Sequence, residues 1–213
     1  MGKRQLSPRP GKILIISSPS GGGKTSICRK LLSRSRREAG WQFSISYTTR
    51  KPRVGERNGR SYYFVSDDKF DQLVKQDFFA EHFKVHLYKY GTPRKPLEAV
   101  RQRGGVMVLD VDVQGARRLR KEYPHAISIF VLPPSRQELV RRLKQRGTES
   151  PEQLKIRIDN ALHEMQTFRR YGFDYVVVNQ ELKEAVKDVL HIVEAHPHRV
   201  ELLDPELLQR ITG

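Results

Sequence analysis

A glycine-rich turn between an apolar run and a helical segment is the part of this sequence best suited to chemistry. Residues 12–29 read KILIISSPSGGGKTSICR, so β-branched residues lead into three glycines and then into Lys24 and Thr25. Strand, glycine loop, Lys-Thr and helix is the order of a phosphate-binding loop. Glycines at 21–23 lack a Cβ, which lets the loop curl with its N–H groups toward an anion. The pattern predicts a nucleotide site, with Lys24 on the β- and γ-phosphates and the Thr25 hydroxyl on Mg²⁺.

The loop departs from the usual pattern at one place, because Ser18 stands where the pattern has its first glycine. An ordinary glycine-rich turn followed by an exposed lysine is the alternative for these residues. The Lys-Thr pair falls at the required offset directly after a buried-type strand, which favours the phosphate-binding interpretation.

Two acidic residues follow a second apolar segment. Asp110 ends VMVLD, the expected setting for the acid that supports Mg²⁺ opposite a phosphate loop. Asp112 lies two residues later, and in an extended chain its side chain points the same way as that of Asp110. Asp112 also precedes a helical segment and is a candidate N-cap, which does not exclude contact with a ligand.

A basic loop offers a place for a second phosphate. Residues 47–60 read YTTRKPRVGERNGR. Arg50, Arg53 and the nearby Tyr62 suit a phosphate, because a planar guanidinium fork can make bidentate contacts and a phenol adds a neutral donor. A basic loop without a ligand is the alternative.

A polar break at 146–150 is flanked by Arg142, Arg146 and Arg157. Arginines on a hinged cover can close over phosphates, neutralise charge in the transition state and exclude water. Arginines spaced four apart are also common on exposed helices, so this signal is weak when taken alone.

Composition limits the class of protein. The chain has 213 residues, which fits one α/β domain, and 40 Lys and Arg against 24 Asp and Glu give a formal charge of +16. This excess indicates polyanionic partners without choosing between nucleic acid and phosphorylated small molecules. No apolar run approaches the length of a membrane span, no secretory signal is expected, and the single Cys28 cannot form an internal disulfide. We therefore expect a cytoplasmic protein without a membrane partner.

Apolar runs alternate with helical segments, and this predicts an α/β fold with a parallel sheet covered on both faces. Shorter, mixed elements at 46–92 interrupt the alternation and indicate an inserted subdomain. In open α/β sheets ligands lie at the carboxyl ends of the strands, where the glycine loop and Asp110 both fall. The predicted strands are 13–16, 41–46, 61–65, 106–109, 126–132 and 175–178, with an extended segment at 78–90; the predicted helices are 25–39, 67–76, 93–103, 113–123, 136–145, 151–170 and 181–195, and a short one from Asp204.

The sequence resembles the guanylate kinases. In order, the similar stretches are SSPSGGGKT, SISYTTRKPRVGERNGRSYYFV, EHFKVHLYKYGTP, LDVDVQGA, IFVLPPS, RRLKQRG and DYVVVN, within about residues 12–195. The resemblance implies Mg²⁺-assisted phosphorylation of GMP or dGMP by ATP, on a P-loop sheet core with an inserted GMP-binding subdomain and a mobile lid. The boundaries implied are a basic tail 1–11, a core 12–45, 93–141 and 159–195, a GMP-binding subdomain 46–92, a lid 142–158 and a C-terminal tail 196–213.

The resemblance also implies roles for individual residues. A carboxylate suits guanine, because guanine offers adjacent N1–H and N2–H₂ donors that adenine lacks. The GMP phosphate would contact Arg50, Arg53, Tyr62 and Tyr90, and the guanine Ser46, Glu81, Thr92 and Asp112. ATP would contact Ser20, Gly21, Gly22, Gly23, Lys24, Thr25, Ser26 and Asn179, the last by the adenine. Lys24, Arg50, Arg142, Arg146 and Arg157 would act on the transferred group, and Thr25 and Asp110 on Mg²⁺, Asp110 through water.

Other functions remain open at this point. A different phosphate-loop kinase is one, and a non-catalytic guanylate-kinase-like interaction domain is another. Such modules typically lose the loop lysine or the glycines, whereas Lys24, Thr25 and Asp110 are present here. Nucleic-acid binding through the positive charge is compatible with either but not expected. The sequence leaves open whether the protein is a monomer or a homo-oligomer.

Overall fold

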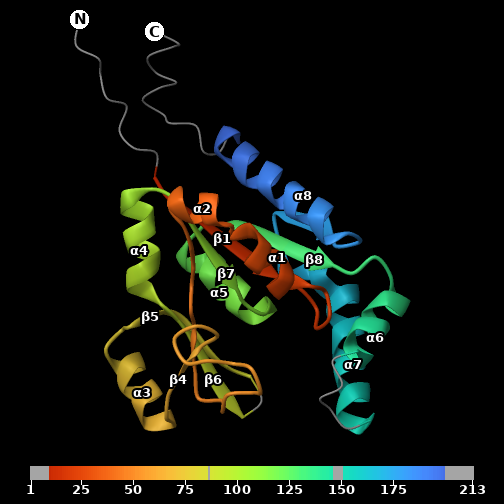
Figure 1. Cartoon of the computed structure of the whole chain (residues 1–213). Helices are drawn as coiled ribbons and strands as arrows, with labels where there is room; N and C mark the ends of the chain where they lie inside the picture. Colours follow the sequence, from red (N-terminus) through yellow and green to blue (C-terminus); the bar gives the residue numbers. More distant parts are fainter. Residues whose placement is uncertain (1–9, 86, 146–150, 200–213) are drawn as a thin grey trace, which may run out of the picture. The chain divides into compact units, whose positions relative to one another are not determined.

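The computed structural model describes residues 10–85, 87–145 and 151–199 (Figure 1). The chain divides into two compact units, one made of residues 1–16 and 32–126 and the other of residues 17–31 and 127–213. Within the described residues, five strands form a sheet in the order β2-β7-β1-β8-β9 and four form a smaller sheet in the order β4-β3-β6-β5. The predicted α/β fold with a parallel sheet and a separate smaller sheet is confirmed.

The first unit is built on a buried parallel strand pair. β1 (Lys12–Ser17) pairs with β7 (Val106–Asp110) in a register that sets Ile16 beside Asp110. β2 (Trp41–Phe43) lies along the other edge of β7. Continuous apolar runs suit strands covered on both faces, and β7 is buried up to Leu109. The strand therefore delivers Asp110, which is only half-buried, at its carboxyl end.

The predicted helix 25–39 is wrong, because the segment forms two helices. These are α1 (Lys24–Leu31) and α2 (Arg34–Glu38). Ser33 lies between them with extended backbone angles, φ −60° and ψ 161°, and begins α2 as its N-cap. Serine is favoured at such a position because it competes with helical hydrogen bonds.

The first unit also contains the smaller, four-stranded sheet. β5 (Phe79–Val85) and β6 (Tyr88–Pro93) form an antiparallel hairpin where a single extended segment was predicted. β3 (Tyr47–Thr48) pairs with β6 and with β4 (Tyr63–Phe64), so the predicted loop at 47–60 begins with a strand and the predicted strand at 61–65 is shorter.

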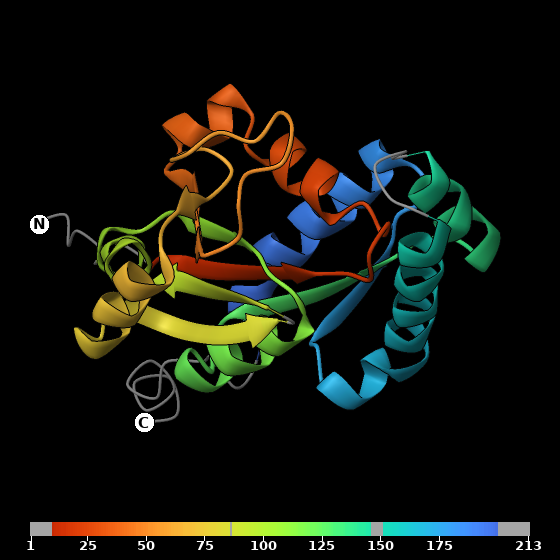
Figure 2. The same cartoon turned by 90° about the horizontal axis from the view of Figure 1, so that it is seen from below.

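Two helices pack on this hairpin. α3 (Asp67–Lys75) begins after Ser66, whose hydroxyl accepts from the Lys69 N–H, and buries Phe70 and Leu73 against Phe79. α5 (Val113–Glu122) begins after Asp112 and lies along β5, as Figure 2 shows. α4 (Arg94–Arg103) follows β6 directly, with Pro93 as its N-cap.

The second unit contains the glycine loop, α1 and the chain from residue 127 onward. β8 (Ile127–Leu132) and β9 (Tyr175–Val178) pair in parallel, and α8 (Leu182–Ala195) packs on α1. α6 (Arg136–Lys144) and α7 (Pro151–Thr167) pack through Leu139, Leu143 and Ala161. The single-turn helices η1 (Phe168–Tyr171) and η2 (His196–His198) follow α7 and α8. The predicted helix from Asp204 lies outside the described residues.

None of the helices in the described part of the chain combines the length and the apolar character that crossing a membrane requires.

Candidate functional site

The glycine loop of the second unit has the backbone that a phosphate cradle needs. Gly21 and Gly23 have φ of +86° and +93°, which side chains with a Cβ rarely adopt. The Gly22 N–H closes a tight turn onto the Pro19 carbonyl at 2.9 Å, and α1 begins at Lys24. Unpaired N–H groups and the positive end of the helix dipole gather at such a helix start. The loop is therefore shaped to receive an anion.

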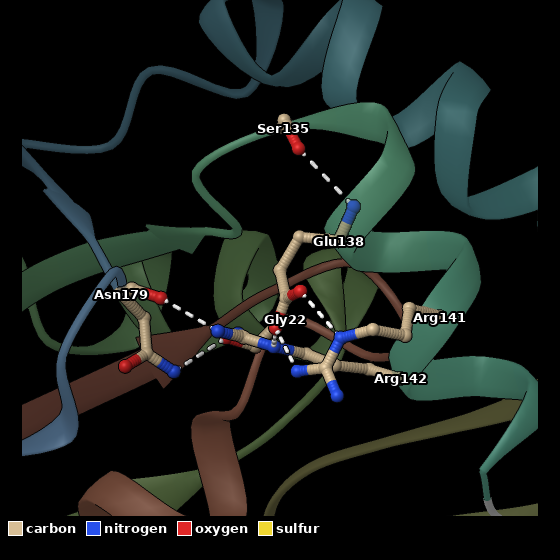
Figure 3. Close-up of polar contacts among 6 residues, drawn as sticks. All are labelled: Gly22, Ser135, Glu138, Arg141, Arg142 and Asn179. Carbon is tan, nitrogen blue, oxygen red and sulfur yellow. Dashed lines mark hydrogen bonds and ion pairs between the residues drawn. The ribbon is translucent and has the colours of Figure 1, made fainter.

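Asn179 links the end of β9 to this loop. Its side-chain Nδ2 donates to the Gly22 carbonyl at 3.0 Å, and this bond is buried (Figure 3). A Cβ added at Gly23 would lie 2.0 Å from the same nitrogen, so glycine is required there by packing as well as by φ. The structure thus places Asn179 against the loop backbone.

Two of the three predicted cover arginines also reach this region. Arg157 of α7 donates from Nε to the Ser20 hydroxyl at 2.6 Å. Arg142 of α6 donates from Nη2 to the Asn179 carbonyl at 2.9 Å. Its Nη1 is buried and has no hydrogen-bond partner among the described residues. Arg146 lies outside those residues. The second unit therefore brings Ser20, Arg142, Arg157 and Asn179 to one loop.

A second cationic group lies in the first unit, in the loop after β3. Both terminal nitrogens of Arg50 donate to Glu56, at 3.0 and 2.8 Å, in a bidentate pair. The Arg53 N–H donates to the same carboxylate at 2.7 Å. Burial raises the pKa of Glu56, but the bonds from Arg50 and Arg53 outweigh it and hold that pKa below its ordinary value. Glu56 is thus ionised at neutral pH and fixes the Arg50 fork.

Aromatic rings complete this group. The Arg50 guanidinium carbon lies 5.5 Å from the ring centre of Tyr62. Tyr62 meets Tyr90 edge to face with ring centres 6.1 Å apart, and Tyr90 stacks on Phe83. Three of the four residues predicted for a second phosphate, Arg50, Tyr62 and Tyr90, are therefore neighbours, and Arg53 joins them through its backbone.

A buried carboxylate lies next to this group on β5. Glu81 is 5% exposed, and its Oε1 accepts a hydrogen bond from the Thr92 hydroxyl at 2.6 Å. Its Oε2 is buried with no hydrogen-bond partner in the described part of the chain. Burial, and to a lesser degree the charge of Asp112, raises the pKa of Glu81 to about 7, against the opposing effects of Thr92 and Arg118. A buried carboxylate oxygen without a donor is costly, and it fits a ligand that brings N–H groups.

The remaining predicted residues occupy defined positions. Asp112 caps α5, because its Oδ1 accepts from the Gly115 N–H at 2.8 Å. The Ser46 carbonyl accepts from the Tyr63 N–H at 2.9 Å, just before β3. Asp110 ends β7 in the first unit, whereas Thr25 and Ser26 are exposed in the first turn of α1 in the second.

Sequence reasoning assigned no role to Glu56 and Glu138, two carboxylates that hold predicted arginines. Glu138 precedes Arg141 and Arg142 by three and four residues in a helix, and that spacing was the available signal. Glu56 is six residues from Arg50 in a loop, where no spacing rule applies.

Comparisons with known proteins give a consistent result. The family model described as guanylate kinase matches residues 10–196. Curated guanylate kinases of Alkalilimnicola ehrlichii and Neisseria gonorrhoeae are 41% and 44% identical, over 95% and 88% of this chain and 97% and 89% of their own. The guanylate kinase of Escherichia coli is 42% identical over 89% of this chain and 90% of its own. The crystal structure of guanylate kinase from Anaplasma phagocytophilum superimposes with a TM-score of 0.74 at 32% identity, covering 92% of this chain and 90% of that one.

Replacing Glu81 by glutamine should stabilise the ligand-free protein at alkaline pH. The carboxyl ionises at its ordinary pKa of 4.5 when unfolded and at about 7 when folded. Between these values the unfolded chain binds fewer protons, so wild-type stability falls as pH rises, by about 3 kcal/mol at most. In urea unfolding, the free energy of unfolding of Glu81→Gln should rise relative to that of the wild type between about pH 5 and about pH 8. Glu194→Gln, at an exposed position of α8, is the control and should track the wild type. An equal gain for Glu81→Gln at both pH values would contradict the raised pKa.

A double-mutant cycle tests the contact between the loop and β9. Gly23→Ala should lower the free energy of unfolding for two reasons. The left-handed backbone is strained by a Cβ, which costs about 1–2 kcal/mol, and the new methyl group displaces the Asn179 amide. In an Asn179→Ala background the second cost disappears, so the alanine should cost less there by about 0.5–3 kcal/mol. Denaturant unfolding of the four proteins measures the difference. Strictly additive effects would show that the two residues do not meet.

Proposed function

This chain belongs to the guanylate kinase family and phosphorylates GMP with ATP, and we propose that its two anion-binding groups divide the two nucleotides between them. ATP binds at the glycine loop of the second unit. GMP binds at the Arg50 loop and the small sheet of the first unit.

The observation that carries the assignment of GMP is the Glu81–Thr92 pair. Thr92 is fully buried and uses its hydroxyl on Oε1, while no described residue donates to Oε2. Guanine presents N1–H and N2–H₂ side by side, and a single ionised carboxylate accepts both. Adenine has no such pair and would leave the buried carboxylate unpaired, which disfavours AMP. Ser46 and Asp112 are the other proposed guanine contacts.

The GMP phosphate is assigned to Arg50, Arg53, Tyr62 and Tyr90. With its terminal nitrogens on Glu56, Arg50 enters the reaction already oriented. Two guanidinium groups offset the charge of a phosphate dianion, and two phenols add neutral hydrogen-bond donors. Arg50 therefore serves both to bind the acceptor and to stabilise its charge during transfer.

The ATP phosphates are assigned to the loop, with Ser20, the glycines at 21–23, Thr25 and Ser26 around them. Lys24 at the start of α1 contacts the β- and γ-phosphates. Arg142 and Arg157, both held near the loop, stabilise charge that spreads over the transferred group, and Arg146 is proposed to join them. Asn179 remains the proposed neighbour of the adenine as well as a support of the loop.

Mg²⁺ is the proposed cofactor. The described residues contain no group of three or more His, Cys, Asp or Glu side chains placed to hold a metal ion. Mg²⁺ does not need such a group, because it commonly takes one or two protein oxygens and otherwise binds phosphate oxygens and water. The Thr25 hydroxyl and the Asp110 carboxylate are the proposed protein contacts, Asp110 through water. When bound, the ion neutralises charge on the β- and γ-phosphates.

Little covalent chemistry is required of the protein itself. The acceptor is already an anionic phosphate, so no strong general base is needed. Positioning the two phosphates in line and stabilising the developing charge account for catalysis. We further propose that dGMP is also an acceptor. The proposed domain boundaries are a GMP-binding subdomain at 46–92 and a lid at 142–158. We propose a cytoplasmic location and leave the oligomeric state open.

An acceptor panel tests the proposed assignment of GMP. With ATP and Mg²⁺, GMP and dGMP should release ADP in a coupled assay, and AMP and CMP should be poor acceptors. Each unpaired buried polar contact costs about 1–3 kcal/mol, roughly a ten- to hundredfold preference per contact. Activity on AMP or CMP with none on GMP would refute the assignment.

Lys24→Met tests whether the loop is catalytic. Losing a charged donor to the transferred group should lower kcat by about 100-fold or more while the free energy of unfolding stays close to that of the wild type. Lys30→Met, an exposed lysine on the same helix, is the matched control and should retain wild-type kcat. A Lys24→Met protein with wild-type turnover would favour an interaction domain whose loop is not catalytic.

A further inference from the structure

Glu138 stands at a position where a helix-capping role is the ordinary expectation. Ser135 and Glu138 form an S-x-x-E sequence at the start of α6, and the Ser135 hydroxyl accepts from the Glu138 N–H at 3.1 Å. In a capping box the glutamate carboxylate turns back to the serine N–H. Here it points to the arginines instead, accepting from Arg141 at 2.7 and 2.6 Å and from Arg142 at 2.7 Å (Figure 3).

Arg142 is consequently held at two points. Its Nε donates to Glu138, and its Nη2 donates to the Asn179 carbonyl at 2.9 Å. Its Nη1 is buried and has no hydrogen-bond partner in the described ranges. That nitrogen lies 3.7 Å from the point where a Cβ on Gly23 would stand, so it faces the backbone of the glycine loop. All of these residues belong to the second unit.

We propose that Glu138 is a positioning residue for the donor nucleotide, which fixes the Arg142 guanidinium so that Nη1 meets an oxygen of the ATP phosphates. The inference rests on the proposed binding of ATP at the glycine loop. A long arginine side chain loses rotamer freedom when it binds, and a partner that holds it beforehand removes part of that cost. The carboxylate also keeps a partly buried cation paired before the phosphates arrive.

Arg141 provides a control that distinguishes the positioning of Arg142 from simple ion pairing with Glu138. It makes a bidentate contact with the same carboxylate, but its side chain is 57% exposed, whereas that of Arg142 is 21% exposed. The bonds from Arg141 and then Arg142 lower the pKa of Glu138 to about 2, so the carboxylate stays ionised under any ordinary assay condition. Removing Arg141 leaves the pair between Glu138 and Arg142 in place.

The test compares Glu138→Gln with Arg141→Gln in the full chain. Glutamine keeps the size of the side chain but removes the charge. Calorimetry with Mg-ATP should show Glu138→Gln binding about 10- to 100-fold more weakly, the usual effect of losing a charged hydrogen bond. The KM for GMP should change less than about twofold, and Arg141→Gln should bind ATP within about twofold of the wild type. In an Arg142→Gln background, Glu138→Gln should add little further loss, because the group that it positions is gone.

The possible outcomes separate the two proposals. ATP bound by Glu138→Gln as tightly as by the wild type, or a full additional loss in the Arg142→Gln background, would overturn the positioning role. A wild-type protein that binds ATP but transfers nothing to GMP would refute the proposed function and leave the Glu138 measurement valid. If Glu138→Gln folds poorly, Glu138→Asp keeps the charge on a shorter side chain and should show the same selective weakening of ATP; unchanged ATP binding there would also overturn the role.

Discussion

In this chain, carboxylates hold in place two arginines that we propose to contact phosphates, before any phosphate arrives. Guanidinium groups gathered in one place repel each other, and their long side chains are free to rotate. Glu56 takes both terminal nitrogens of Arg50, and Glu138 takes Nε of Arg142. Arg142 keeps its Nη1 without a hydrogen-bond partner among the described residues. The same arrangement therefore occurs twice, once in each unit, at groups that we assign to different nucleotides.

The glycine loop shows the same dependence on distant parts of the chain. Its positive φ angles are allowed by glycine, but its shape is supported by Asn179, which lies 157 residues from the Gly22 carbonyl that it contacts. The Asn179 backbone also accepts the bond from Arg142, so one residue at the end of β9 touches both the loop and a cation. A local sequence motif thus supplies a flexible segment, and tertiary contacts select one conformation of it.

Local signals account for what could be predicted. β7, β8 and β9 were placed within about a residue, because strands buried on both faces are continuous apolar runs. Asp112 was predicted as a candidate N-cap, and it caps α5. The helix at 25–39 was wrong because apolar periodicity does not detect the extended backbone of Ser33. β3 and β4 have two residues each and exist through cross-strand pairing, which leaves almost no local pattern. Glu81 was found only through the family resemblance, since its burial depends on how β5, β6 and α5 come together.

That burial explains why Glu81 suits recognition better than it suits stability. In the ligand-free protein the carboxylate gains one bond from Thr92 and keeps Oε2 without a donor from any described residue. Desolvation raises its pKa to about 7, so near neutral pH the fold either takes up a proton there or tolerates a buried charge. Both states are less favourable than an exposed carboxylate. In the proposed binding mode, a purine with two adjacent N–H donors would satisfy the ionised form and would recover in binding a cost already incurred in folding. A base without those donors would recover nothing, and under the proposed assignment that difference is the source of selectivity for guanine.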